Sequence, residues 1–343
     1  MPVATFDLDP VAPDHHAKPS LRSRIRVAGM RLTHADRAFS GAASLRESIR
    51  TRRRAEDETP PAEMHTRYWV MRRIMEGRPV YTIRPLKRRS PRHVLYLHGG
   101  SYVHQIQRDH WKFLARLIDR TGCTVTVPLY PLAPSSHGED ALTMVRTVHD
   151  TLFAHTPSEN KVFMGDSAGA ALALVLARQL GEAGAVTPKE VAMISPWLDV
   201  TMTDPMTTAL EHCDPYLRIE GLAEAGRLYA GERDRRDPTI SPLNAPAATP
   251  GRLSLFAGTR DILLSDARRF RAQCRREGVE LGYFEYPGMF HGWQLSDVPE
   301  ARHALRQMER IVRRPAPKPI ETVAHRRVPD DRTDELAVIG AAG

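Results

Sequence analysis

Residues 161–180, KVFMGDSAGAALALVLARQL, decide the fold of this chain. The first four residues, KVFM, are typical of a strand. The run from Ala168 onward is rich in alanine and leucine and is typical of a helix. Between the two, residues 165–169 read GDSAG and match the G-x-S-x-G elbow. At a sharp turn between a strand and a helix, a serine takes a strained conformation that lifts its hydroxyl above the sheet. The flanking glycines have no Cβ, so the backbones of the strand and the helix can approach each other closely. We therefore expect Ser167 to be a nucleophile at one edge of a sheet.

Short apolar runs recur on both sides of this stretch, and most of them lack polar and apolar alternation. Such runs are typical of strands that are buried on both faces of a parallel sheet. Helical stripes separate most of them, which indicates βαβ crossovers and helices on both faces. The pattern therefore predicts an α/β fold with a mostly parallel sheet. The expected strands are 94–97, 125–129, 162–164, 191–194, 253–257 and 283–286, and the expected helices 141–152, 168–180, 267–274 and 298–308.

The same pattern sets the domain boundaries. Residues 1–60 lack strand-like runs and end at a Pro-Pro pair, so we expect a basic N-terminal arm there and a catalytic domain at 61–313. Met64, Tyr68, Met71 and Met75 are spaced as on one helical face. A proline-rich stretch at 201–250 interrupts the alternation as an insertion would. Residues 314–343, rich in proline and charge at their start, are predicted to be a flexible tail.

Composition excludes several classes of protein. The chain has 343 residues, 41% hydrophobic and 26% charged, which is typical of an ordered globular protein. No run approaches the ~20 apolar residues that a membrane-spanning helix needs, and Asp7 and Asp9 stand where a signal peptide would be basic or apolar. The three cysteines are odd in number and widely spaced, which argues against a disulfide framework and a zinc site. We therefore expect a cytoplasmic protein without a cofactor.

The net charge of +8 is concentrated near the N-terminus. Ten arginines stand against two acidic residues between positions 20 and 54, so the remainder of the chain is nearly neutral. Leu21, Ile25, Ala28 and Leu32 recur at helical spacing among these arginines. The pattern predicts an amphipathic helix that either contacts an anionic membrane or acidic partner, or packs as a solvated helix against the body of the protein. We favour the second alternative, and we do not expect nucleic acid as the partner.

Attack of a serine on an ester needs donors for the negative charge that develops on the carbonyl oxygen. Residues 97–102, LHGGSY, follow the predicted strand 94–97 directly and can turn backbone N–H groups into a shared pocket. Gly99 and Gly100, together with the N–H of Ala168, are the predicted oxyanion hole. His98 precedes the serine in the chain and is expected to orient this loop.

The base and the acid follow from chain order, because the triad of α/β-hydrolases runs Ser, acid, His. After the strand at 253–257, His303 falls in a helical stripe and His325 in the tail, whereas His291 lies in a loop just beyond the last strand. We therefore expect His291 to be the base. Asp261 follows the strand at 253–257 at the edge where such sheets bind ligands, so we prefer it as the acid over Asp199, one strand earlier.

Together these motifs make the chain resemble the hormone-sensitive-lipase-like esterases, a branch of the α/β-hydrolases with an H-G-G-G oxyanion motif and a G-D-S-A-G elbow. The likeness covers about residues 81–312. It includes five further motifs: YPLAP at 130–134, SPWLD at 195–199, SPL at 241–243, GTRDIL at 258–263 and HG at 291–292. Two positions depart from the pattern. Ser101 replaces the third glycine, as in the acetyl-ester hydrolases of this branch, and SSHG at 135–138 replaces an acidic, proline-rich stretch.

The resemblance implies an eight-stranded sheet and a helical lid built from residues of about 61–78 and 201–250. It also implies a serine carboxylesterase that cleaves short- to medium-chain esters, acetyl esters included, through an acyl-enzyme on Ser167. An amidase of the arylformamidase kind is the alternative that keeps the same triad. A receptor that has lost catalysis is disfavoured because both the base and the acid are present. A small-molecule ester is the expected partner, and the sequence leaves a homodimer open.

Overall fold

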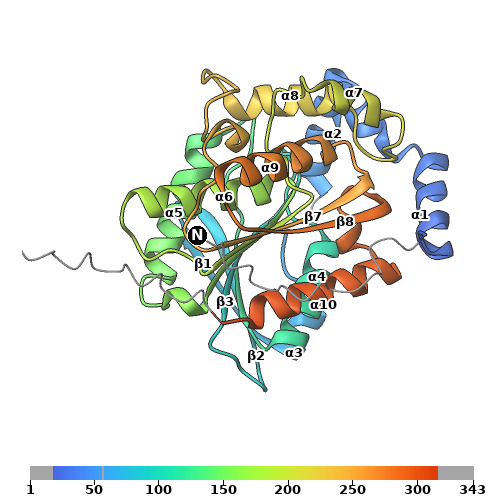
Figure 1. Ribbon diagram of the computed structural model, residues 1–343. Helices are drawn as coiled ribbons and strands as arrows, with labels where there is room; N and C mark the ends of the chain where they lie inside the picture. The colour runs from blue at the N-terminus through green and yellow to red at the C-terminus, as the bar shows by residue number, and fades with distance from the viewer. Residues whose placement is uncertain (1–17, 56–57, 316–343) are drawn as a thin grey trace, which may run out of the picture.

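The computed structural model describes residues 18–55 and 58–315, which are built around one twisted sheet of eight strands (Figure 1). The strands lie in the order β1-β2-β4-β3-β5-β6-β7-β8, and β2 runs antiparallel to both of its neighbours while the others are parallel. The prediction of a mostly parallel eight-stranded sheet is confirmed. The strands are β1 Tyr68–Met75, β2 Arg78–Pro85, β3 His93–Leu97, β4 Thr124–Pro128, β5 Lys161–Asp166, β6 Glu190–Ile194, β7 Arg252–Arg260 and β8 Leu281–Phe290.

Helices cover both faces of the sheet, as expected (Figure 1). Alternate side chains of each central strand enter two separate cores: Leu95 and Leu97 of β3 pack in one, Val94 and Tyr96 in the other. Because full burial of such a side chain stabilises the fold by roughly 1.5–3 kcal/mol, runs that are apolar on both faces specify central strands. The first core is covered by α5 Gly138–Leu152, α6 Ala168–Glu182 and α9 Leu264–Glu277, and the second by α4 Arg108–Thr121 and α10 Pro299–Arg313.

Helices from two distant parts of the chain cover the carboxyl edge of the sheet. The N-terminal group packs against the insertion through an Arg46–Glu224 ion pair of 2.8 Å, and η2 approaches α8 so closely that a Cβ at Gly221 would lie 2.4 Å from the Phe39 carbonyl. Residues 18–55 are therefore part of the folded body, and residues 1–17 of the predicted arm lie outside the described residues. These elements are α1 Leu21–Leu32, η2 Ala35–Phe39, α2 Ala42–Ala55, α7 Pro205–Glu211 and α8 Ile219–Ala230.

The prediction of a helix through residues 64–75, as part of a lid at about 61–78, is wrong. The helix α3, Ala62–Arg67, ends after six residues, and β1 begins at Tyr68 as the outermost strand of the sheet. Met71 and Met75 are four residues apart, a spacing that places two side chains on one face of a strand as well as of a helix. The turn at Glu76 and Gly77, both with positive φ, joins β1 to β2 as a hairpin. The cover over the site comes from 18–55 and 201–250.

The chain beyond α10 is held at the amino end of the sheet. The Arg314 guanidinium pairs with the carboxylate of Glu190, the first residue of β6, and Arg252 Nη1 donates to the Pro315 carbonyl at 2.8 Å. The first two residues of the predicted tail are thus fixed, and 316–343 lie outside the described residues. Within the part of the chain that the structure describes, no helix is long and apolar enough to cross a membrane.

Candidate active site

Ser167 stands at the sharp turn between β5 and α6. Its backbone is strained, with φ 52° and ψ −121°, and its N–H donates to the Ile194 carbonyl at 2.8 Å. A Cβ at Gly165 would lie 2.5 Å from the Gly169 carbonyl, and one at Gly169 would lie 2.0 Å from the Leu97 carbonyl. Only glycine fits at both positions, so the two glycines of the motif hold the serine between a strand and a helix at close approach.

His291 and Asp261 meet at the neighbouring strand ends. Nδ1 of His291, just after β8, lies 3.0 Å from Oδ2 of Asp261, just after β7, and both side chains are buried. Oδ1 of Asp261 accepts the Leu263 N–H at 2.9 Å, which fixes the carboxylate. In the neutral imidazole a proton on Nδ1 leaves Nε2 as the acceptor. Among the described residues, His291 and Ser167 line the same cavity but make no hydrogen bond to each other, as in many substrate-free sites.

Charge around His291 favours its protonated form. Burial alone would lower the pKa of the imidazole, but the charge of Asp261 and its hydrogen bond, with further contributions from Asp214 and Asp166, hold this pKa above its usual value. Asp214 belongs to the insertion at 201–250. Its Oδ2 accepts the N–H of Ile262, the residue after Asp261, at 2.9 Å. Burial and the charge of Asp261 raise the pKa of Asp214 to about 6.

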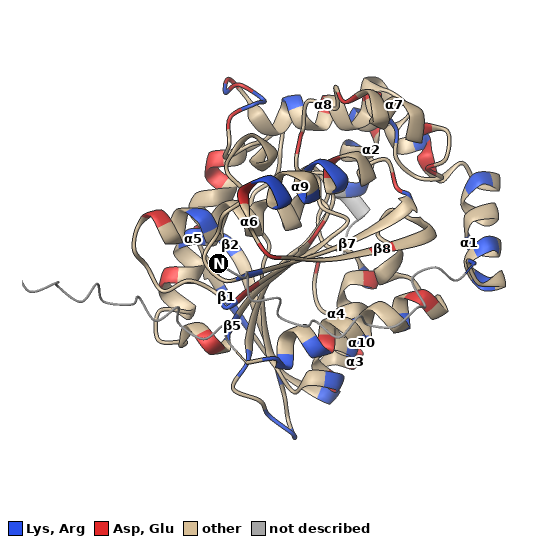
Figure 2. Cartoon of the chain, in the orientation of Figure 1, with Lys and Arg blue, Asp and Glu red and all other residues tan. Residues whose placement is uncertain are grey.

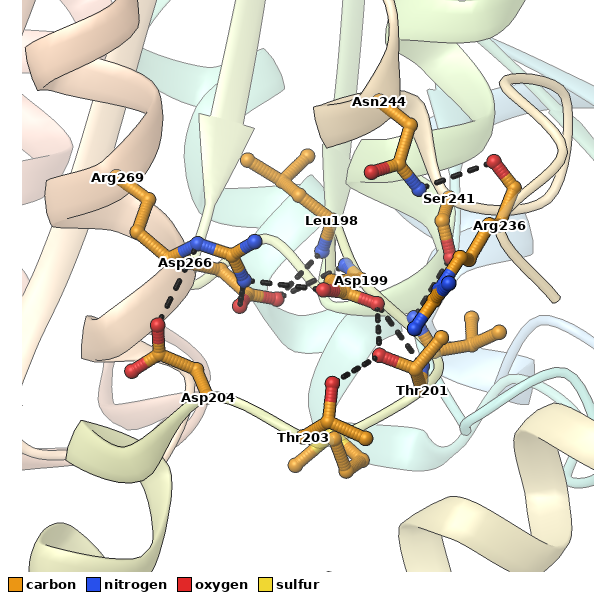
Figure 3. A network of polar contacts seen from close by, with 12 residues as sticks. Leu198, Asp199, Thr201, Thr203, Asp204, Arg236, Ser241, Asn244, Asp266 and Arg269 are labelled. Carbon is orange, nitrogen blue, oxygen red and sulfur yellow. Dashed lines mark hydrogen bonds and ion pairs between the residues drawn. The ribbon is translucent and has the colours of Figure 1, made fainter.

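Asp199, the alternative acid, is engaged elsewhere (Figure 3). Its Oδ1 accepts from the N–H and hydroxyl of Thr201 at 3.0 and 2.6 Å, and its Oδ2 from Arg269 Nη1 at 3.0 Å. Asp266 lies beneath it and accepts the Leu198 and Asp199 N–H groups at 3.1 and 2.9 Å; burial, then the charge of Asp199, raises the pKa of Asp266 to about 8. This network orders the loop after β6 and does not include His291.

The predicted oxyanion hole needs one correction. The N–H of Gly99 donates to Oδ1 of Asp166 at 2.9 Å, so Gly99 is not free to bind a substrate oxygen. Within residues 18–55 and 58–315, no hydrogen bond engages the N–H groups of Gly100, Ser101 or Ala168. Gly100 and Ser101 have φ of 123° and 53°, which turns the loop back over the cavity. The N–H of Gly99 is therefore engaged by Asp166, whereas that of Ser101 is free of hydrogen bonds to the described residues.

His98 orients this loop, as expected. Burial lowers the pKa of His98 to about 4, so the ring is neutral at physiological pH, and Nδ1 lies 2.7 Å from the Gly99 carbonyl. The ring stacks on Tyr130 with 4.5 Å between centroids, and the Tyr130 hydroxyl donates to the His98 carbonyl at 2.5 Å. Tyr130, the first residue of the YPLAP motif, therefore holds the loop at residues 98–101 in place through His98.

A cavity of about 190 Å³ opens over Ser167. Its outer wall comes from the N-terminal helices and the insertion, which contribute Arg26, Met30, Phe39, Arg52, Tyr216 and Leu217. No sequence pattern marks these side chains, because only the packing of helices distant in the chain brings them together. The altered loop at 135–138 does not line the cavity: His137 Nδ1 lies 3.1 Å from the Leu228 carbonyl, on α8. Among the described residues, no group of three or more His, Cys, Asp or Glu is placed to hold a metal ion.

Comparison with known proteins agrees with this geometry. A family model described as alpha/beta hydrolase fold matches residues 94–295, more than half of the chain. The chain is 30% identical to an acetyl-hydrolase of Streptomyces hygroscopicus over 65% of its own length and 75% of that protein. It is 29% identical to an esterase of Acinetobacter venetianus, over 62% and 71% of the two chains. A crystal structure of an esterase from the bacterial hormone-sensitive lipase family superposes with a TM-score of 0.75 at 26% identity, covering 86% and 99%.

Proposed function

Because the chain belongs to the alpha/beta hydrolase fold family, in its hormone-sensitive-lipase-like branch, we propose that it is a serine carboxylesterase that forms an acyl-enzyme on Ser167. The observation that carries the proposal is the 3.0 Å contact between buried Asp261 and His291, whose imidazole lines the same cavity as the strained serine. A base oriented by a carboxylate beside a serine is the arrangement that activates a hydroxyl for attack.

The reaction has two halves. In the first, His291 Nε2 takes the proton of Ser167 as its Oγ attacks the ester carbonyl, and Asp261 stabilises the imidazolium. The N–H groups of Gly100, Ser101 and Ala168 bind the oxyanion of the tetrahedral intermediate, and His291 returns the proton to the departing alcohol. In the second half, His291 deprotonates a water molecule that attacks the acyl-enzyme, and collapse of the second intermediate releases the acid and the serine.

The size of the cavity supports a small acyl group. At about 190 Å³ it lies below the ~300–1,000 Å³ of sites that enclose drug-sized ligands. A preference for small acyl groups is also supported by the similarity to the Streptomyces acetyl-hydrolase and by the serine at position 101. We therefore expect acetyl and other short-chain esters to be turned over best. Measurement of kcat/KM for p-nitrophenyl esters from acetate to palmitate tests this, and preference for palmitate would contradict it.

The catalytic assignment is tested with Ser167→Ala. We expect the variant to melt like the unchanged protein, to lose ester hydrolysis and to lose labelling by a fluorophosphonate. Ser296→Ala is the matched control, because Ser296 lines the same cavity but has an ordinary extended backbone, with φ −81° and ψ 164°. Undiminished turnover by Ser167→Ala would overturn the proposal. An N-formyl anilide assayed in parallel separates the amidase alternative, which predicts faster cleavage of the anilide than of p-nitrophenyl acetate.

We also propose that α1 contacts anionic lipid. The predicted amphipathic helix is present, but three of its apolar side chains face solvent: Leu21, Ile25 and Leu32 are 69%, 63% and 81% exposed. Figure 2 shows basic positions along this helix at the margin of the molecule. Exposed apolar side chains between arginines are the pattern of helices that bind anionic membrane surfaces.

Sedimentation with vesicles tests the contact. We expect the protein to bind vesicles of phosphatidylglycerol and phosphatidylcholine, and to bind pure phosphatidylcholine less. Ile25→Asp with Leu32→Asp should abolish the binding while ester turnover in solution persists. Equal binding by this double variant, or binding to DNA without any to vesicles, would contradict the proposal.

A further inference from the structure

Two arginines in the cavity wall have no carboxylate partner among residues 18–55 and 58–315. Arg52 of α2 and Arg26 of α1 both line the cavity over Ser167, and neither forms an ion pair within the part of the chain that the structure describes. Nη1 of Arg52 is buried and makes no hydrogen bond there. Arginines next to these two on the same helices behave differently. Arg50 pairs with Glu47 at 2.7 Å, and Arg22 with Asp297 at 2.5 Å.

The carboxylates around the cavity already have partners. Asp109 pairs with Lys112 at 2.9 Å, and Asp261 holds His291. Asp166 accepts from the Tyr96 hydroxyl at 2.6 Å, from Gly99 at 2.9 Å, and lies 3.3 Å from Nε2 of His110. The cavity therefore contains one buried guanidinium nitrogen whose hydrogen-bonding capacity the described protein groups do not use.

The chemistry of the guanidinium defines what completes the site. Arginine stays charged at any physiological pH, and burying one of its donors without a partner is unfavourable. Its planar fork matches a carboxylate, to which it can donate two parallel hydrogen bonds. Phosphate fits the same fork but is bulkier, and the cavity of about 190 Å³ must also hold the ester carbonyl over Ser167.

We propose that the substrates of this site are esters that carry a free carboxylate, which Arg52 binds, while Arg26 adds positive charge at the mouth of the cavity. The inference rests on the proposed esterase activity and specifies its substrate class. The carboxylate takes no part in bond making. It fixes the position of the ester relative to Ser167, and it accepts from Nη1 of Arg52, which no described protein group engages. Arg52 is therefore a specificity-determining residue.

Two matched pairs of esters test the proposal on the full-length chain. For a carboxylate in the alcohol part, 4-acetoxybenzoate is compared with the neutral 4-acetoxybenzamide. For one in the acyl part, mono-p-nitrophenyl succinate is compared with p-nitrophenyl butyrate. The quantity of interest is the ratio of kcat/KM for the anionic ester to that for its neutral partner, because a comparison of this ratio between variants cancels the intrinsic reactivity of each ester.

We expect Arg52→Gln to lower this ratio about tenfold or more for one of the two pairs, as for loss of a charge-assisted hydrogen bond. The affected pair identifies the side of the ester that carries the carboxylate. Arg50→Gln removes the same charge from the same helix outside the cavity and should leave both ratios unchanged. Arg52→Lys keeps the charge without the fork and should lower the ratio less.

An unchanged ratio for both pairs in a folded Arg52→Gln protein would overturn the inference, and so would an equal loss in Arg50→Gln. If Arg52→Gln does not fold, Arg52→Lys and Arg26→Gln decide in the same way. Failure of the esterase proposal is distinguishable, because in that case none of the four esters is hydrolysed in a manner that depends on Ser167.

Discussion

The N–H of Gly99 donates a 2.9 Å hydrogen bond to Oδ1 of Asp166, so the residue before the candidate nucleophile holds the first glycine of the oxyanion loop. A Cβ at Gly99 would lie 2.2 Å from the other oxygen of the same carboxylate, which shows how closely the two loops approach. The bond leaves Gly100 and Ser101 to line the cavity. The donors and the serine are thus positioned by one buried side chain.

Asp166→Ala should therefore impair both stability and catalysis. It leaves the Gly99 N–H and the Tyr96 hydroxyl without their acceptor, at a cost of about 1–3 kcal/mol for each buried group. Displacement of the loop should lower kcat by about a hundredfold, as for loss of one oxyanion donor. Tyr96→Phe is the control, because it should reduce the free energy of unfolding alone. Asp166→Ala with an unchanged kcat would show that the loop holds its position without this bond.

Ser101→Gly should be tolerated and should stabilise the protein. Ser101 has a φ of 53°, a left-handed conformation that costs a residue with a Cβ about 1–2 kcal/mol, and glycine relieves it at some cost in entropy. We expect the free energy of unfolding to rise by up to about 1 kcal/mol and kcat to persist, because the N–H remains. Denaturant unfolding and p-nitrophenyl acetate assays check this. A large loss of kcat would assign a role to the Ser101 hydroxyl instead.

Asp214→Asn should shift the pH dependence of the reaction. The base must be neutral, so kcat/KM falls as the pH drops through the pKa of His291. Asp261, Asp214 and Asp166 all raise this pKa. Removal of the negative charge of Asp214 lowers it, so the acidic limb of the profile should move to lower pH. If Asp214 only stabilised the structure, Asp214→Asn would reduce the rate without moving the acidic limb. An acidic limb that stays at the same pH would therefore contradict the electrostatic role of Asp214.

Asp199→Asn separates the two candidate acids. Because Asp199 bonds to Thr201 and Arg269 and not to His291, we expect its loss to lower the melting temperature and to leave kcat within about threefold. Asp261→Asn should instead reduce kcat by about 10³- to 10⁴-fold, because the imidazole loses the partner that fixes its tautomer. If the two effects were reversed, the acid would be Asp199.

Much of the fold could be predicted because its central strands are buried on both faces. The runs at 94–97 and 191–194 fall within one residue of β3 and β6, since apolar residues are required at each of their positions. The prediction fails at 64–75 because the four-residue spacing of Met71 and Met75 fits one face of a strand as well as one face of a helix. The helix α4, Arg108–Thr121, is absent from the prediction, although Trp111, Leu114 and Ile118 recur at helical spacing and are buried in the structure.

The pairing of His291 with Asp261 could be predicted because chain order and strand ends are properties of the sequence. The structure brings Asp261 and His291 together from the ends of adjacent strands. The donor at Gly99 could not be excluded in the same way, since its partner Asp166 lies 67 residues further along the chain. Arg52 likewise reaches the cavity only because α2 folds over the sheet.

The ion pair between Arg314 and Glu190 has a practical consequence for anyone who attaches this protein to a support. It anchors the C-terminal segment at the amino end of β6, whereas Ser167, Asp261 and His291 all follow the carboxyl ends of their strands. With a rise of ~3.3 Å per residue, a five-residue strand separates the two ends by roughly 16 Å. An attachment point introduced at Pro315 should therefore leave the entrance of the cavity open to solvent, while a bulky fusion next to α1 would stand beside the wall that Arg26 forms.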